Sequence, residues 1–441
     1  MKLRGLMIAI VVLAGLTGAL YWSNRHKPAD TAEASADAQP KILTLKQEDI
    51  SKIDLKKKGE DELVLAKDGS GKWQITSPQP LGVEQNAVSP ILSSLSTLSS
   101  ERLVEDKASD LGQYGLSDPG LAATITEKNN KTHELLLGDK TPAGNAVYAK
   151  LEGDPRIFII ASYNKGNIDK SVNDLRDKRL LTVEADKISK VELIAGKEDI
   201  EFGRNKDAWQ IVKPKPLRAD GPQVEGLVRT LTEARMDLST EQDTKKLASA
   251  FAVAAPVATA RVTAESGTQE LQVRKNKDDY YAKSSVVEGV YKVASSVGKG
   301  MDKGLEDFRN KKLFDFGFSD PNKVEIQDGA RSYFLTRSGD DWWNGSGKKL
   351  DAGSAQPVVE KIRDLSASKF VDSGFTTPAI ELTVTSNDGK RIEKVEIAHK
   401  DASYIARREG EASLYEVDAQ AIVDLEKAAE QMKAVAAPAG K

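Results

Sequence analysis

The side chains best suited to proton transfer or metal binding are scarce in this chain of 441 residues. It has no Cys, and its three His residues are His26, His133 and His399. The absence of Cys excludes thiolate nucleophiles, Cys-ligated zinc, iron–sulfur clusters and disulfide bonds. His133 and His399 lie in expected strands, THELLLG and VEIAHKD, and neither has a companion at ligand spacing. We therefore predict no His-based triad and no metal site.

Carboxylates and Gly-Lys pairs give no stronger sign of catalysis. No acidic pair stands out among the 67 Asp and Glu residues, so a carboxylate-dependent hydrolase stays the less favoured alternative. Gly71-Lys72, Gly298-Lys299 and Gly347-Lys348 lack the earlier Gly and the following Ser or Thr of a phosphate-binding loop. We expect a protein that is not an enzyme and binds no cofactor.

Aromatic and basic residues are the candidates for contact with a partner. Trp343 should face the opposite side of its strand from Trp342, so we expect it to be exposed. With Tyr280 it could bind a glycan or a peptide. The basic stretches that begin at Arg176 and Arg309 are expected at helix ends, where cations offset the helix dipole. Contact of these Arg residues with a protein partner is the alternative.

One pattern recurs three times along the chain. ISKIDL at 50–55 returns as ISKVEL at 188–193 and as PNKVEI at 321–326. A Trp follows each motif, at Trp73, Trp209 and Trp342, and we expect these indoles to lie in a core. Two further positions recur, a Pro that opens a strand and a Tyr within a later strand. They are Pro119, Pro256 and Pro378, and Tyr148, Tyr281 and Tyr404.

The segments between these positions predict the fold class. Apolar residues at helical spacing follow each Trp. They are Val88, Ile91, Leu92, Leu95 and Leu98; Val224, Leu227, Val228 and Leu231; and Val358, Val359, Ile362 and Leu365. Second helices are expected at 174–181, 307–314 and 422–432. Because the strands are joined by short connections, we predict α+β units, each with an antiparallel sheet and two helices.

The first 40 residues differ from the rest. Residues 5–22 form an uncharged run that predicts one transmembrane helix, and a cleaved signal peptide is the alternative. Residues 28–40 hold no large apolar side chain and predict a disordered tether. The net charge is -3, and the part beyond Lys27 carries 60 basic against 67 acidic residues. This balance argues against binding to nucleic acid or to an anionic lipid surface.

The predicted organisation is therefore a transmembrane anchor with its flanks (1–27), a disordered tether (28–40), three related α+β units (41–181, 182–314 and 315–433) and a flexible tail (434–441). We expect the anchor to lie in the inner membrane and the body in the periplasm, or at least outside the cytoplasm.

The first repeat carries a more specific set of motifs. It holds Trp73, YGL at 114–116, Pro119, LG at 137–138, TP at 141–142 and Tyr148, and the second repeat keeps Trp209, Pro256, Tyr281 and the ending FRNKKLF. This pattern resembles the bacterial family known as domain of unknown function forty-three-forty. The resemblance implies an envelope protein of the inner membrane, often associated with an ABC-type transport system of the gliding-motility auxiliary kind. It implies no catalytic residues. The expected function is that of a non-catalytic accessory or scaffold subunit of a membrane complex, with a periplasmic glycan- or peptide-binding module as the alternative.

Overall fold

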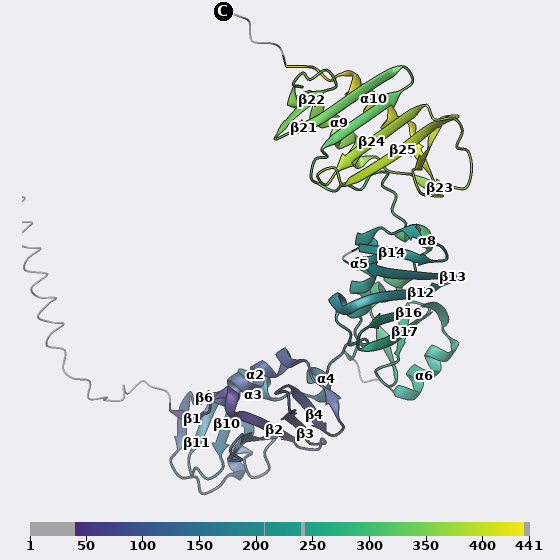
Figure 1. Cartoon of the computed structure of the whole chain (residues 1–441). Coiled ribbons are helices and arrows are strands. Elements are labelled where there is room, and N and C mark those ends of the chain that lie inside the picture. Colours follow the sequence, from purple (N-terminus) through teal and green to yellow (C-terminus); the bar gives the residue numbers. More distant parts are fainter. Residues whose placement is uncertain (1–39, 207, 240–242, 436–441) are drawn as a thin grey trace, which may run out of the picture. The chain divides into compact units, whose positions relative to one another are not determined.

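A computed structural model describes residues 40–206, 208–239 and 243–435. The predicted anchor at 5–22, most of the predicted tether and most of the predicted tail lie outside these residues. Within the described ranges, no helix is both long and apolar enough to cross a membrane. The described chain forms three large antiparallel sheets and one small one (Figure 1).

The first large sheet has nine strands in the order β5-β4-β3-β2-β8-β9-β10-β11-β7. Their bounds are β2 (Ile50–Lys57), β3 (Leu63–Lys67), β4 (Trp73–Ser77), β5 (Leu81–Gly82), β7 (Arg102–Glu105), β8 (Leu121–Glu127), β9 (Thr132–Lys140), β10 (Ala146–Leu151) and β11 (Ile157–Ala161). Beside it, β1 (Lys41–Thr44) pairs with β6 (Thr97–Ser99). The helices of this part are α2 (Gln85–Ser96), α3 (Ser162–Ile168) and α4 (Val172–Leu175).

The second large sheet has eight strands in the order β15-β14-β13-β12-β16-β17-β18-β19. Their bounds are β12 (Ile188–Ala195), β13 (Glu198–Asn205), β14 (Ala208–Lys213), β15 (Leu217–Arg218), β16 (Ala255–Ala264), β17 (Gly267–Asn276), β18 (Asp279–Ser284) and β19 (Val290–Val293). Its helices are α5 (Gly221–Thr232), α6 (Thr244–Val253), α7 (Ser295–Met301) and α8 (Leu305–Phe308).

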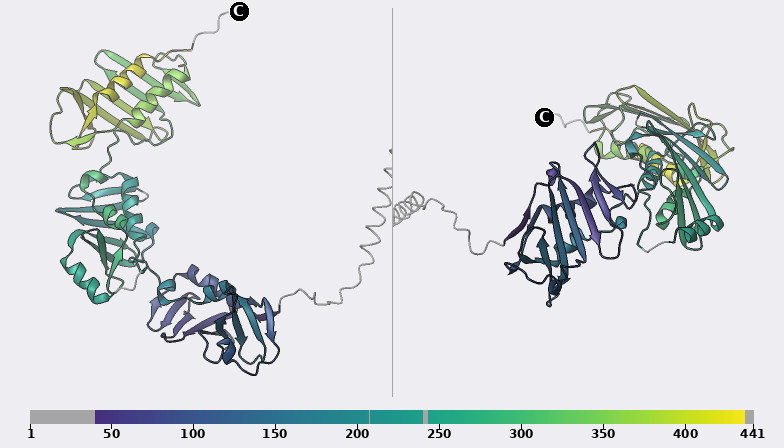
Figure 2. Two further views of the ribbon diagram at one scale, coloured as in Figure 1. Left: turned by 180° about the vertical axis from the view of Figure 1, so that it is seen from behind. Right: turned by 90° about the horizontal axis from the view of Figure 1, so that it is seen from below.

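The third large sheet also has eight strands, in the order β22-β21-β20-β24-β25-β26-β27-β23. Their bounds are β20 (Lys323–Asp328), β21 (Arg331–Ser338), β22 (Asp341–Asn344), β23 (Lys369–Val371), β24 (Ile380–Ser386), β25 (Arg391–Lys400), β26 (Ser403–Arg408) and β27 (Leu414–Asp418). Its helices are α9 (Ala352–Asp364) and α10 (Ala419–Glu430), which lie side by side against one face of the sheet (Figures 1 and 2).

The recurring motif forms a central strand in each large sheet, in the same register. Each central strand places an apolar residue between two apolar cross-strand partners. The sets are Ile53 between Leu65 and Ile125, Val191 between Phe202 and Val262, and Val324 between Leu335 and Val384. Cross-strand pairs of this kind stabilise a sheet, and the alternation of apolar with polar residues leaves one face for helices. The predicted α+β class with antiparallel sheets is confirmed.

The first helix after each Trp carries its predicted apolar stripe into the core. In α5, for example, Val224, Leu227, Val228 and Leu231 are all buried. One end of the first stripe was placed wrongly, because α2 ends at Ser96 and Leu98 lies in β6. The prediction of two helices per unit also fails outside the third sheet. The second large sheet has α6 in addition, where Leu247 and Phe251 pack against Tyr281 in a small separate cluster.

The predicted closing helices at 174–181 and 307–314 are wrong. Only one turn of helix forms in each, in α4 and α8, and the following residues are extended. The reason is that Arg176 and Arg309 pair as β-bridges with Val83 and Ala219 beside the short edge strands. These edge positions satisfy backbone groups that a longer helix would have bonded internally.

Each large sheet has its own hydrophobic core, and the chain enters two of these cores directly from the extended closing segments. Leu180 and Leu181 lie in the core of the second sheet, and Leu313 and Phe314 lie in that of the third. The chain divides into two compact units, residues 1–178 and 179–441, so the second and third sheets belong to one unit.

Candidate functional site

Trp343, a predicted partner contact, lies on the edge strand β22 of the third sheet. It is half-buried, whereas the neighbouring Trp342 is buried in the core, as expected for opposite faces of one strand. The indole Nε1 of Trp343 is buried and has no hydrogen-bond partner among the described residues. Phe334 on the adjacent strand β21 is 41% exposed. Trp343 is therefore less accessible than predicted.

Tyr280, the second predicted aromatic contact, is not exposed as expected. It is 7% exposed and belongs to the core of the second sheet. Its ring lies against Gly298 in α7, where a Cβ atom would collide with the ring carbons. The predicted exposure of Tyr280 is wrong because Tyr280 and Tyr281 place one ring on each face of β18, and both faces are covered. Tyr281 is buried by α6.

Replacing Gly298 by Ala is expected to destabilise the second core by about 1–3 kcal/mol, because the new methyl group would overpack against an aromatic ring that cannot move aside. Gly166→Ala in α3 is the matched control, since nothing lies within 4 Å of a Cβ built there. That change should be neutral or slightly stabilising, because Ala favours helix over Gly. Thermal unfolding of both variants tests this, and equal effects would contradict the packing argument.

The predicted basic contacts, Arg176 and Arg309, are not free cations on helix ends. Both follow a single helical turn in extended conformation, and Arg176 has partners in the structure. Arg309 is 12% exposed in its side chain. Its guanidinium stacks 3.4 Å from the centroid of the Phe370 ring and donates a hydrogen bond to Ser413 Oγ at 3.0 Å. Arg309 therefore joins the second and third sheets.

Arg218 makes a second connection between these sheets. This residue ends β15, and its guanidinium donates hydrogen bonds to the Lys312 carbonyl and, at 3.3 Å, to Tyr415 Oη. It also forms an ion pair with Glu411 at 2.9 Å. Burial alone would lower the pKa of Arg218, but Tyr415, Glu411 and Asp315 outweigh burial and raise it. Arg218 therefore stays charged inside this contact.

Buried charges continue from this contact into the third sheet. Arg408 and Glu393 pair at 3.0 Å, and their side chains are only 10% and 5% exposed. Arg408 also pairs with Glu411 at 2.8 Å and donates to the Leu313 carbonyl at 2.5 Å. We call Arg218, Arg309, Glu393, Arg408, Glu411 and Tyr415 the joint cluster. It holds the segment that links the two sheets.

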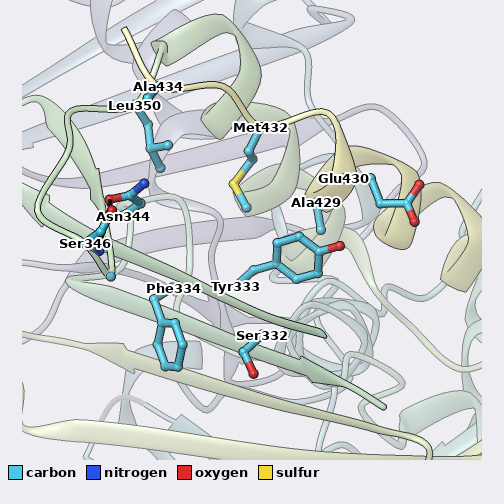
Figure 3. Close-up of a pocket in the computed structure, with 11 residues that line it drawn as sticks. Ser332, Tyr333, Phe334, Asn344, Ser346, Leu350, Ala429, Glu430, Met432 and Ala434 are labelled. Atoms are coloured by element: carbon cyan, nitrogen blue, oxygen red, sulfur yellow. Dashed lines mark hydrogen bonds between the residues drawn. The ribbon is translucent and has the colours of Figure 1, made fainter. Parts of the chain in front are cut away.

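A groove of about 400 Å³ opens on the third sheet. Its walls come from β21, from the turn after β22 and from the chain that follows α10, and its apolar part includes Tyr333, Leu350, Ala429 and Met432. Figure 3 shows Tyr333 and Met432 on one side of β21, and Phe334 and Ser332 on the other side. The volume falls in the range of small-molecule and side-chain sites.

One rim of the groove carries an ion pair. Glu430 lines the groove and pairs with Arg331. Glu426, one turn earlier on α10, has its pKa raised by burial and by the charges of Asp328 and Glu430. Burial is the largest cause of the raised pKa of Glu426, and the charges of Arg331 and His399 oppose it.

No metal site appears among the described residues, where no group of three or more His, Asp and Glu side chains could hold an ion. His133 contacts Glu127 at 2.9 Å, and the His399 ring packs on that of Tyr404. These two His residues lie in different sheets and do not converge.

The recurring positions of the sequence occupy equivalent places in the three sheets. Trp73, Trp209 and Trp342 are buried. Pro256 is the second residue of β16, while Pro119 and Pro378 lie two residues before β8 and β24. Tyr148, Tyr281 and Tyr404 lie in β10, β18 and β26. Tyr148 packs on Tyr114, whose hydroxyl donates to Glu105 at 2.7 Å, and this bond raises the pKa of Tyr114 to about 12.

Comparison with known proteins identifies a family but no activity. The family model described as domain of unknown function (DUF4340) matches residues 73–208 and 209–382. No curated protein and no solved structure matches the chain. Each match begins at a core Trp, and the first runs through the closing segment into the first strands of the second sheet. Because the two matches together span more than half of the sequence, the chain belongs to the DUF4340 family.

Proposed function

We propose that this protein is a non-catalytic scaffold or accessory subunit of a membrane complex. Residues 5–22 would anchor it in the inner membrane, and the body would lie in the periplasm. The observation that carries the proposal is the continuous connection between the second and third sheets. Asn310 still donates its backbone N–H to the Arg218 carbonyl at the edge of the second sheet, and Leu313 is already in the third core. The chain thus passes from the second core to the third without a linker. Such a connection suits a scaffold subunit, which holds its partner proteins in position.

The proposal includes three related units in tandem. The large sheets share seven strands in the same order, from β4 to β11, from β14 to β19 and from β22 to β27. Eight residues separate the buried entry residue from the start of the central motif in every case, from Ile42 to Ile50, from Leu180 to Ile188 and from Leu313 to Pro321. The joint cluster supports the view that at least the last two units act as one body.

Cross-linking in intact cells tests the scaffold function. A lysine-reactive cross-linker should join the body to a small, reproducible set of membrane proteins, with components of an ABC-type transport system among them. A variant in which a cleavable signal peptide replaces residues 1–27 should lose these cross-links. Recovery of links within single chains only would contradict the proposal. Alkaline phosphatase fused after Lys41 should be active, and an inactive fusion would place the body in the cytoplasm.

A periplasmic peptide-binding module is the second candidate function. The groove on the third sheet favours it, because part of its wall is apolar, with Tyr333, Leu350 and Met432. A glycan site at Trp343 has less support, since that indole is half-buried.

A further inference from the structure

The groove on the third sheet lies where the other two sheets bury a large apolar side chain. In each sheet, the residue before the first long helix donates its backbone N–H to a carbonyl of the closing segment. The pairs are Glu84 with Leu175, Asp220 with Phe308, and Asp351 with Lys433. Two residues later the pairing continues, with Asp177 to Gly82, Asn310 to Arg218 and Val435 to Lys349. Leu175, Phe308 and Lys433 are therefore equivalent positions.

The side chains at these positions differ sharply. Leu175 and Phe308 are completely buried, and Phe308 meets Phe202 edge-on with 4.9 Å between ring centroids. Lys433 is exposed. The preceding residue, Met432, only partly covers the third core and lines the groove. The third core is thus left open at the place where Leu175 and Phe308 close the other two.

A change in the helices accounts for this opening. The first two sheets have two short helices before the equivalent position, α3 and α4, and α7 and α8. In the third sheet the single helix α10 runs to Glu430. Its last turn takes the place that the start of α4 or α8 has in the other two sheets. Met432 is flexible and can move to admit another side chain.

Residues 436–441, with the sequence AAPAGK, hold no large apolar side chain that could take this place. In the first two sheets the buried residue is followed by Arg, at Arg176 and Arg309. At the groove, the carboxylate of Glu430 already pairs with Arg331, so the apolar side chain is the feature that a partner must supply.

We infer that the groove between β21 and the end of α10 binds a segment of a partner protein through one large apolar side chain, Leu or Phe. The backbone of residues 433–435 already occupies the edge of the sheet, so the partner inserts its side chain and adds no strand there. This inference deepens the proposed function, on which it rests for the existence of a partner.

A peptide with the sequence of residues 304–312, GLEDFRNKK, is the probe, because it carries the Phe-Arg pair that closes the second core. Fluorescence anisotropy of the labelled peptide should show saturable binding to the purified body, residues 40–441. The same peptide with Phe308→Ala should bind at least about tenfold more weakly, since about 1.4 kcal/mol corresponds to tenfold and a buried Phe contributes more.

Variants of the protein locate the binding. Met432→Phe should fill the groove, raise the melting temperature and reduce binding at least about tenfold. Val423→Phe adds the same side chain to α10 at a position that is 46% exposed, and it should leave binding unchanged. If the peptide instead displaced residues 304–312 from the second sheet, Met432→Phe would have no effect on binding.

Absence of saturable binding up to about 1 mM, or binding that Met432→Phe does not weaken, would overturn the inference. Neither result touches the scaffold proposal, which is tested by cross-links in cells. Conversely, peptide binding that requires an open groove would support the inference even if those cross-links were absent.

Discussion

Replacing Phe308 by Ala is expected to lower the free energy of unfolding of the second core by about 3–5 kcal/mol. The side chain is fully buried and contacts Phe202, so its removal leaves a cavity as well as the lost transfer free energy. The cavity should stay open, since Phe308 lies in a close-packed core beside α5.

Lys433→Ala is the matched control for this substitution, because Lys433 holds the equivalent backbone position in the third sheet and is exposed. Its effect should stay within about 0.5 kcal/mol. Since a chain of several cores need not unfold in one step, the readout should be local. Hydrogen exchange of β12 and β13 in increasing guanidinium serves this purpose. Similar effects of the two substitutions would contradict the equivalence on which the groove argument depends.

Replacing Glu393 by Ala is expected to destabilise the third core by about 3–5 kcal/mol, because it leaves the buried Arg408 without the more buried of its two carboxylate partners. Arg408 keeps Glu411, which is 23% exposed, so we expect a loss near the lower end of that range. Glu393 also accepts the backbone N–H of Asp315 at 3.1 Å, and this hydrogen bond would be lost as well.

Glu396→Ala on the same strand is the control for Glu393→Ala. Glu396 pairs with Arg407 in a contact where the side chains are 23% and 49% exposed. Exposed pairs contribute about 0–1 kcal/mol, so this change should be small and should shrink further at high salt. Unfolding followed through hydrogen exchange of β24 and β25 compares the two. If Glu396→Ala lowered the free energy of unfolding as much as Glu393→Ala, burial of an ion pair would not determine its contribution to stability.

The strands and the first helices could be predicted from the sequence because their signals are local. The alternation in ISKIDL and its two relatives gives the central strands, and the spacing of Val224, Leu227, Val228 and Leu231 gives α5. The closing segments were misread because NDLRDKRLL has helix-forming residues, and only pairing with a distant edge strand keeps its end extended.

The candidate sites were harder to predict because they depend on residues far apart in the chain. Arg218 meets Glu411 and Tyr415 almost two hundred residues later, and no local pattern marks the three as partners. The groove follows from the replacement of a buried Phe or Leu by Lys433, which an alignment of the repeats by backbone pairing reveals. The residues before Lys433 form one long helix instead of two short ones, so the local sequence does not show that Lys433 stands in place of Phe308.

The central claim is that the second and third sheets are held as one body by the joint cluster. The chain has no Cys, so spin labels can be placed without background at Lys197→Cys in the second sheet and Lys390→Cys in the third. Both residues are exposed. A second pair of spin labels, at Lys197→Cys and Glu265→Cys within the second sheet, gives the width of the distance distribution that is expected for a rigid body.

Double electron–electron resonance between the labels at Lys197→Cys and Lys390→Cys tests the claim most directly. We predict a single narrow distance distribution, close in width to that of the pair within the second sheet, and a clear broadening when Arg218→Ala and Arg309→Ala are combined. A broad distribution in the protein with an intact joint cluster, unchanged by these two substitutions, would contradict the account.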